Sequence, residues 1–173
     1  MAIAAKPQTA SNDFAEFVGQ HTDGLLTTAY LLTRDRDRAQ ELLQDVLVRL
    51  YPHWHKVAAA ESPVAYVRRS VVNRFLSQRK RRLELVTDRV PERSDPGDGD
   101  RLLDRDQLRR MLATLPERQR AALVLRFFYD YPDARIAEAM GCRVGTVRSL
   151  ISRALASLRA TRSSEHELRG EHR

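Results

Sequence analysis

Apolar residues recur along this chain at intervals of three and four, the spacing of one face of an α-helix. The clearest stripe is formed by Ala39, Leu42, Leu43, Val46, Leu47 and Leu50. Further stripes cover residues 14–32, 64–75, 108–115, 121–128, 136–140 and 147–158. No run alternates apolar and polar residues for long enough to predict a strand. The pattern therefore predicts an all-α protein.

Individual residues predict where several of these helices begin or end. Pro52 ends the helix that carries the stripe over 39–50, because proline cannot continue the hydrogen-bond ladder. Ser62 followed by Pro63 is typical of a helix N-terminus, with serine as the cap. Asp35 resembles a cap before the second helix, and Gly141 ends the short helix over 136–140.

Charge divides the chain into two basic modules with an acidic stretch between them. Residues 62–82 carry seven basic residues and no acid, and residues 134–162 carry six arginines and one acid. Residues 83–101 instead hold six acids against three arginines, with two prolines and two glycines, which is typical of a flexible linker. We therefore predict two small helical domains, joined by that acidic linker. The predicted boundaries are a disordered tail 1–11, domains 12–82 and 102–162, the linker 83–101 and a frayed tail 163–173.

Composition narrows the class of function. The 173 residues include 30 Lys and Arg against 23 Asp and Glu, and the net charge of +7 favours a polyanionic partner. Cys142 is the single cysteine, which excludes an intrachain disulfide and favours a reducing, cytoplasmic setting. We expect no secretory signal and no membrane insertion. His53 and His55 lack a third ligand nearby, and no phosphate-binding loop or nucleophile motif is present, so we expect no metal, no cofactor and no enzyme.

The most specific motif is the segment ARIAEAMGCRVGTVRSLISRAL, residues 134–155. It predicts a short helix, a glycine-containing turn and a longer helix, the layout of a helix-turn-helix whose second helix enters the major groove of DNA. The second helix leaves a polar face without an acid, formed by Thr146, Arg148, Ser149, Ser152 and Arg153. These side chains donate hydrogen bonds to base edges and phosphates.

With this motif in place, residues 102–162 resemble region 4 of bacterial sigma factors of the extracytoplasmic-function group. The resemblance rests on the Leu-Pro-x-x-x-Arg helix at 115–120, Ile-Ala-x-x-Met-Gly at 136–141 and Gly-Thr-Val-Arg-Ser at 145–149. It implies binding to the −35 promoter element and to the flap of RNA polymerase. The residues that it assigns to the −35 contact are Arg120, Arg143, Thr146, Arg148, Ser149, Ser152 and Arg153.

Residues 12–82 resemble region 2 of the same group. The resemblance rests on the segments AYLLTRDRDRAQELLQDVLVRLYPHW and SPVAYVRRSVVNRFLSQRKRR. It implies that the first segment docks on the clamp of core RNA polymerase. The residues that it assigns to docking share one helix face and are Glu41, Gln44, Asp45 and Arg49.

The second segment and the loop before it are similar to the part of region 2 that recognises and melts the −10 element. A polar row at spacings of three and four can follow a DNA strand while Asn73 reads an exposed base. The loop PHWHKVAAAES corresponds to the family's capture loop for a flipped base. The expected −10 contacts are Trp54, Lys56, Tyr66, Arg69, Asn73, Arg74, Ser77, Arg79, Lys80, Arg81 and Arg82. Core packing remains the alternative for Trp54 and Tyr66.

These observations favour a sigma factor, which directs core RNA polymerase to promoters and helps to melt them. Its expected partners are the polymerase clamp and flap, promoter DNA and an anti-sigma factor. The alternative is a helix-turn-helix regulator that acts without joining the polymerase, although residues 12–82 show no sensor domain. A nuclease or recombinase would need clustered carboxylates or a nucleophile, and the acids here are scattered or lie in the linker.

Overall fold

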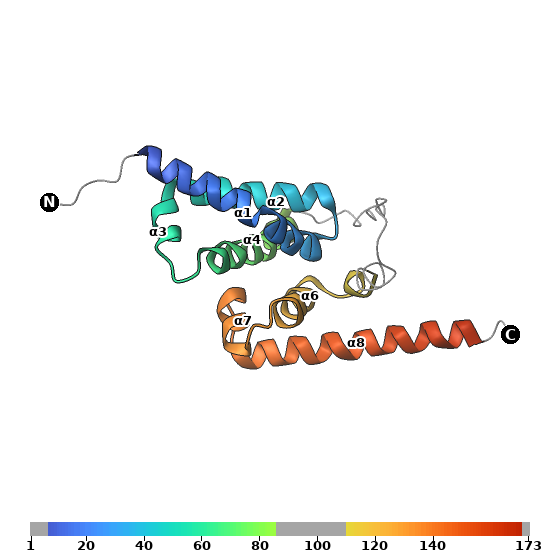
Figure 1. Cartoon of the computed structure of the whole chain (residues 1–173). Coiled ribbons are helices and arrows are strands. Elements are labelled where there is room, and N and C mark those ends of the chain that lie inside the picture. The colour runs from blue at the N-terminus through green and yellow to red at the C-terminus, as the bar shows by residue number, and fades with distance from the viewer. Residues whose placement is uncertain (1–6, 86–109, 171–173) are drawn as a thin grey trace. The chain divides into compact units, whose positions relative to one another are not determined.

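A computed structural model of the chain describes residues 7–85 and 110–170, with side chains over 12–78 and 110–161 (Figure 1). The regular elements in these ranges are all helical, which confirms the expected fold class. The chain divides into two compact units, residues 1–77 and 78–173. Within the described ranges, no helix is sufficiently long and apolar to cross a membrane.

The first unit is built around two helices, α1 (Pro7–Thr33) and α2 (Arg36–Leu50), which pack against each other (Figure 1). The turn between them is short because Asp35 caps α2, and its side chain accepts a hydrogen bond from the Arg38 amide at 3.0 Å. The stripe predicted over 39–50 faces inward, and Ala39, Leu42, Leu43 and Val46 are buried. The apolar stripe of α2 and the Asp35 cap therefore together stabilise the helix pair α1 and α2.

After α2 the chain continues in helical turns, where a loop was expected. A 3-10 turn spans Tyr51–His53, and α3 spans Trp54–Ala58. Proline is compatible with the first turn of a helix, so Pro52 ends α2 and at the same time opens the 3-10 turn. α3 packs on α1, and buried Trp54 anchors it there.

The last helix of the first unit, α4 (Pro63–Leu85), begins where the sequence predicted. The Ser62 hydroxyl accepts a hydrogen bond from the Ala65 amide at 3.4 Å, and the Ser62 carbonyl accepts one from the Tyr66 amide at 3.0 Å. The inward face of the helix carries Val67, Val71, Val72 and Phe75, all buried. The serine cap and this apolar face position the remaining polar faces of α4.

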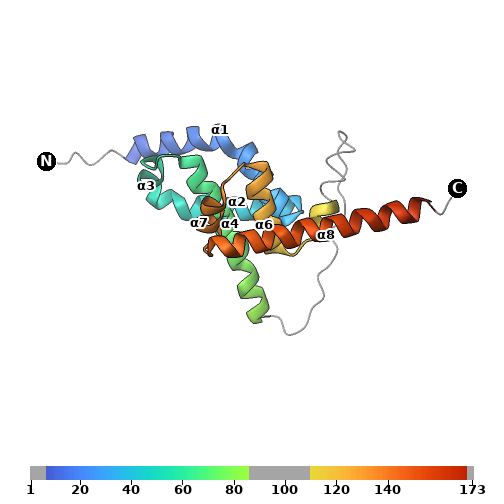
Figure 2. The ribbon, with the colours of Figure 1, turned by 90° about the horizontal axis from the view of Figure 1, so that it is seen from below.

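After the end of α4, the described part of the second unit continues with helical residues 110–113, followed by α6 (Glu117–Leu123) and a π-helical turn over Val124–Phe128. It continues with α7 (Asp133–Met140) and α8 (Val144–Gly170). α8 packs against both α6 and α7, and it extends well past them (Figure 2). The core between these helices includes Leu125, Ile136 and Val147, each with no exposed surface.

The turn from α7 to α8 depends on Gly141, which adopts a left-handed conformation with φ of 59°. Its amide donates to the Glu138 carbonyl at 3.3 Å, and the Cys142 amide donates to the Ala137 carbonyl at 3.0 Å. These two bonds form a Schellman motif, which satisfies the last carbonyls of α7. The predicted helix-turn-helix is therefore present, with a turn that favours glycine.

We expect Gly141→Ala to lower the free energy of unfolding by about 1–2 kcal/mol, because an L-residue pays that cost in the left-handed region. A Cβ atom at Gly141 would meet nothing within 4 Å, so the cost is one of backbone conformation and not of crowding. Gly145→Ala is the matched control: it is the second residue of α8, has open space around it, and should stabilise by about 0.4–1 kcal/mol because alanine restricts the unfolded chain. Chemical denaturation of both variants measures the difference, and equal effects would contradict this account of the turn.

Three observed borders differ from the expected ones. α1 begins at Pro7, so residues 7–11 are helical where a disordered tail was expected. α8 continues to Gly170, through most of the expected frayed tail, because its last turns contain strong helix formers and no proline. Residues 83–85 belong to α4, and the rest of the expected linker lies outside the described residues.

Candidate nucleic-acid interface

The predicted docking face on α2 is exposed at three of its four positions. Glu41, Gln44 and Arg49 are exposed, whereas Asp45 is half-buried. The same side of the helix also presents Val48, which is 72% exposed. The sequence analysis did not select Val48, although an apolar residue outside the stripe on α2 is the signal that could have identified it. The face is thus mixed, with acidic, amide and apolar groups together.

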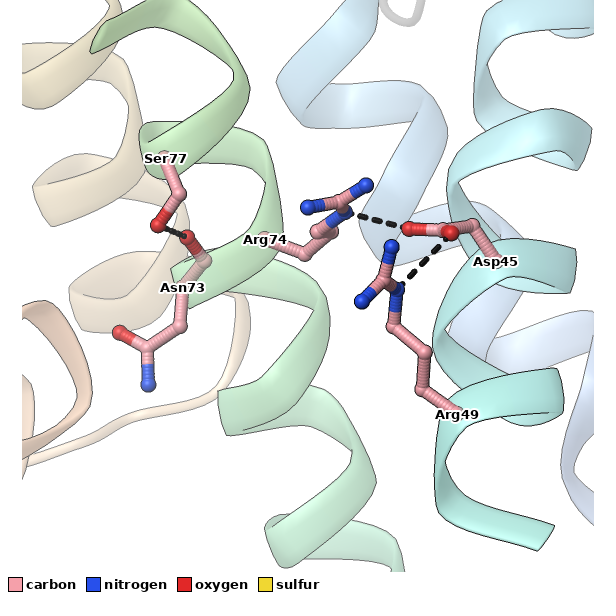
Figure 3. Close-up of polar contacts among 5 residues, drawn as sticks. All are labelled: Asp45, Arg49, Asn73, Arg74 and Ser77. Atoms are coloured by element: carbon pink, nitrogen blue, oxygen red, sulfur yellow. Dashed lines mark hydrogen bonds and ion pairs between the residues drawn. The ribbon is translucent and has the colours of Figure 1, made fainter. Parts of the chain in front are cut away.

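Asp45 is held by two arginines of its own unit (Figure 3). One carboxylate oxygen accepts from Arg49 Nε at 2.9 Å, one turn further along α2, and the other accepts from Arg74 Nε on α4. Partial burial raises the pKa of Asp45, but the hydrogen bonds and charges of both guanidinium groups outweigh it and lower the pKa below its ordinary value. Asp45 therefore joins α2 to α4 as a charged link.

We expect Asp45→Ala to destabilise the chain by about 1–3 kcal/mol, because it leaves Arg74, which is 21% exposed, without its carboxylate. A carboxyl with a lowered folded pKa contributes stability above its unfolded pKa and loses it as the pH falls through the folded value. The gap between wild type and Asp45→Ala should therefore narrow below about pH 4. Denaturation at several pH values measures this gap.

Glu41→Ala is the control for that experiment, since it removes an exposed carboxylate from the same helix. Its effect should stay within about 0.5 kcal/mol. A gap between wild type and Asp45→Ala that is independent of pH would show that the ion pairs do not account for the stability.

The described residues of α4 that were expected to contact the −10 element are exposed, except Arg74. Tyr66 is 44% exposed, and Arg69, Asn73 and Ser77 are exposed as well. Arg74 points toward α2, and the Asn73 side chain points away from it (Figure 3). Arg74 is therefore engaged with Asp45 and does not belong to the exposed row. Of the basic residues that follow, the side chains of Arg79, Lys80, Arg81 and Arg82 lie outside the described residues.

Trp54 lies in the core, which agrees with the core-packing alternative and not with the expected contact with the −10 element. It is 4% exposed, and its ring centroid lies 5.1 Å from that of Phe14 and 4.7 Å from that of Phe17. Because the side chain is almost completely covered, no ring face remains for stacking on a base. Lys56, two residues further along α3, is exposed.

In the second unit, the start of α8 exposes the polar face that the sequence predicted. Its exposed members are Arg143, Thr146, Arg148, Ser149, Ser152 and Arg153. The Arg143 carbonyl accepts hydrogen bonds from the amides of Thr146 and Val147, so this residue caps α8 through its backbone. The Arg153 guanidinium donates to the Ser149 carbonyl at 3.2 Å. The described part of this face contains donors and no carboxylate of its own.

Arg120 was expected to contact the −35 element, but the structure buries it. It is 4% exposed, and its Nη2 donates to the Leu115 carbonyl at 3.0 Å. The guanidinium thus satisfies a carbonyl just before α6, inside the second unit. A long side chain can fold back in this way, so its charge alone does not indicate whether it faces solvent.

A further polar cluster was missed by the sequence analysis. Asp133, in the first turn of α7, accepts a hydrogen bond from Arg148 Nε at 3.1 Å. Its other oxygen lies 3.4 Å from Arg126 Nη1, which also donates to the Tyr131 carbonyl at 3.1 Å. Residues 126, 133 and 148 are widely spaced and lie on different elements, so no single helical pattern links them. Among the described residues, no group of three or more His, Cys, Asp or Glu could hold a metal ion.

Comparison with known proteins matches both units to described families. The family model "Sigma-70 region 2" matches residues 17–83, and "Sigma-70, region 4" matches residues 105–158. The chain is 38% identical over 149 residues to the RNA polymerase sigma-E factor of Streptomyces avermitilis, covering 85% of this chain and 83% of that protein. It is 28% identical to the ECF RNA polymerase sigma factor SigL of Mycobacterium tuberculosis, covering 82% and 84%.

Similar folds occur among solved structures. The sigma factor RpoE, in complex with the anti-sigma factor NepR from Bartonella quintana, matches with a TM-score of 0.64 and 25% identity, covering 86% of this chain and 95% of that one. CnrH, in complex with the cytosolic domain of CnrY, matches with a TM-score of 0.59 and 21% identity, covering 91% and 94%.

Proposed function

The chain belongs to the sigma-70 family, in the extracytoplasmic-function group, and directs RNA polymerase to promoters; from this premise we propose how its two units divide the work. The observation that carries the proposal is that each unit exposes a polar helix face free of acids in its described part. One face lies on α4 of the first unit and the other at the start of α8 in the second. Two such faces suit a promoter with two separate elements.

The first unit binds the −10 element and the polymerase clamp. On α4, exposed Asn73 has both a donor and an acceptor to read an unstacked base, while Arg69 and Ser77 flank it along the strand. On α2, Glu41 and Gln44 present the docking groups, and Val48 adds apolar area to the same surface. Asp45 contributes by holding α2 and α4 together.

The second unit takes the −35 element and the flap. Thr146, Arg148 and Ser149 lie in the first turns of α8, where the side chains of a recognition helix reach base edges. Arg143 and Arg153 are exposed on either side and contact phosphates. The π-helical turn that follows α6 exposes Phe127 and Phe128, at 66% and 48%, which provides an apolar surface for a polymerase element.

The remaining expectations follow the same premise. The chain acts by binding rather than by catalysis, and it works in the cytoplasm, where polymerase and promoter DNA are found. The Bartonella quintana sigma factor of similar fold was solved with an anti-sigma factor, and we propose a protein of that class as a partner of this chain. A helix-turn-helix regulator that acts without the polymerase has no use for a sigma region 2 domain, and residues 17–83 match the model of that region.

The proposal is tested by transcription with core RNA polymerase of Streptomyces coelicolor, the source of a similar sigma factor. Addition of this chain should produce start sites that are absent with core enzyme alone. Asn73→Ala should reduce transcription from duplex promoters, and a template already opened over the −10 element should restore it. Failure of the chain to create any start site, or an equal loss on both templates, would contradict the proposal.

A further inference from the structure

The Asp133 cluster lies beside the proposed reading face of α8. Arg148 is 73% exposed there, whereas Asp133, on α7, is only 23% exposed. The two residues and Arg126 line an open groove of about 340 Å³, together with Ile151 and Leu155. An exposed arginine is thus tied to a carboxylate that is mostly covered by protein.

The atoms used in this contact determine what remains available to DNA. Arg148 donates to Asp133 through Nε. This contact does not use Nη1 and Nη2, which form the end of the side chain. That end carries a pair of parallel donors, which match the O6 and N7 acceptors of guanine in the major groove. The carboxylate restricts the rotamers of a long side chain before DNA arrives, and this reduces the ordering cost of binding.

Asp133 is itself fixed. Its second oxygen lies near Arg126 Nη1, and that nitrogen also donates to the Tyr131 carbonyl. The cluster is therefore anchored to the backbone of the turn before α7, which carries Asp133 in its first turn. An aspartate that contacts two arginines is held in a defined orientation.

We propose that Asp133 is a positioning residue that sets the promoter selectivity of this sigma factor by orienting Arg148 toward a base of the −35 element. The inference rests on the proposed function of α8, and it adds a residue that itself touches no DNA. Arg126 completes the arrangement by holding Asp133 in place.

If Asp133 has this role, its removal should lower −35 selectivity and raise non-specific affinity for DNA. Without the carboxylate, Arg148 must be ordered during binding, so discrimination against substituted −35 sequences should fall by about three- to tenfold. Loss of a negative charge near the DNA should at the same time raise non-specific affinity at low salt. A purely structural defect in the second unit would instead weaken both kinds of binding.

The experiment uses holoenzyme reconstituted with Asp133→Ala, Asp133→Asn or wild-type chain, on promoter libraries randomised at the −35 element. Asp130→Asn is the matched control, because it removes the same charge from an exposed position just before α7. Asp130 has φ of 51°, a conformation that asparagine tolerates. Asp133→Asn keeps a neutral acceptor for Arg148, so its selectivity should lie between those of wild type and Asp133→Ala.

A double-mutant cycle with Arg148→Ala shows through which residue Asp133 acts. Once Arg148 is absent, Asp133→Ala should have no further effect on selectivity. If Arg148→Ala changes selectivity but Asp133→Ala does not, or if Asp130→Asn changes it equally, the positioning role is wrong. If Arg148→Ala leaves the sequence preference unchanged, the assignment of α8 as the −35 reader fails instead.

Discussion

Glu41→Lys should lower the affinity of the chain for core RNA polymerase by about ten- to a hundredfold while leaving its stability unchanged. Glu41 is exposed on α2, so its replacement by another charged side chain should alter the free energy of unfolding by only about 0.5 kcal/mol. Opposite a basic docking surface, the reversal replaces attraction with repulsion, and the expected loss of affinity corresponds to about 1.4–2.8 kcal/mol. A pull-down with core enzyme measures the loss, and circular dichroism reports the fold.

Glu16→Lys provides the charge-matched control, since Glu16 is exposed on α1 and outside the docking face. Both variants should bind DNA non-specifically a little more tightly, because both raise the net charge from +7. Only Glu41→Lys should show a lower affinity for core RNA polymerase. Equal binding by both variants would show that the α2 face is merely solvated.

A double reversal at Glu41 and Asp45 would be a poorer test than the single change. Asp45 accepts bonds from Arg49 and Arg74, so a lysine there would place three positive charges together. Such a variant loses stability and docking at once, and the two causes could not be separated. The structure therefore identifies Glu41 as the position for charge reversal.

Trp54→Ala should destabilise the first unit by about 3–5 kcal/mol, the usual cost of removing a large aromatic side chain from a core. Trp54 packs against Phe14 and Phe17 of α1, and its removal leaves a cavity between α1 and α3. Trp54→Phe keeps an aromatic ring in place and should cost less than Trp54→Ala, because it removes fewer buried atoms. Denaturation measures both values. A variant Trp54→Ala that folds normally but fails to melt promoters would restore the base-contact role.

The elements that the sequence predicted correctly depend on local signals. The apolar stripe over 39–50 and the caps at Asp35 and Ser62 each act within a few residues of the chain, and the structure confirms all three. Gly141 likewise ends α7 because of its own backbone conformation. Local physical chemistry was therefore sufficient to predict the fold class and the helix-turn-helix.

The candidate site was less predictable because its contacts join distant parts of the chain. The resemblance to region 2 assigned Arg74 to DNA, but it pairs with Asp45, 29 residues earlier. The resemblance to region 4 assigned Arg120 to the −35 contact, but its guanidinium satisfies a buried carbonyl. Asp133 lies 15 residues from Arg148 and shares no helix with it. Such partners depend on how helices pack, which the periodicity of one helix does not determine.

The burial of Trp54 also allows the unfolding of the first unit to be followed separately, by fluorescence. It is the single tryptophan of the chain, and it lies in the first unit, whereas the second unit contains only tyrosine and phenylalanine as aromatic residues. Tryptophan emission should therefore shift to the red when the first unit unfolds and its indole meets water. Ellipticity reports the helices of both units. The difference between the two melting curves would isolate the unfolding of the helix-turn-helix unit without dividing the protein.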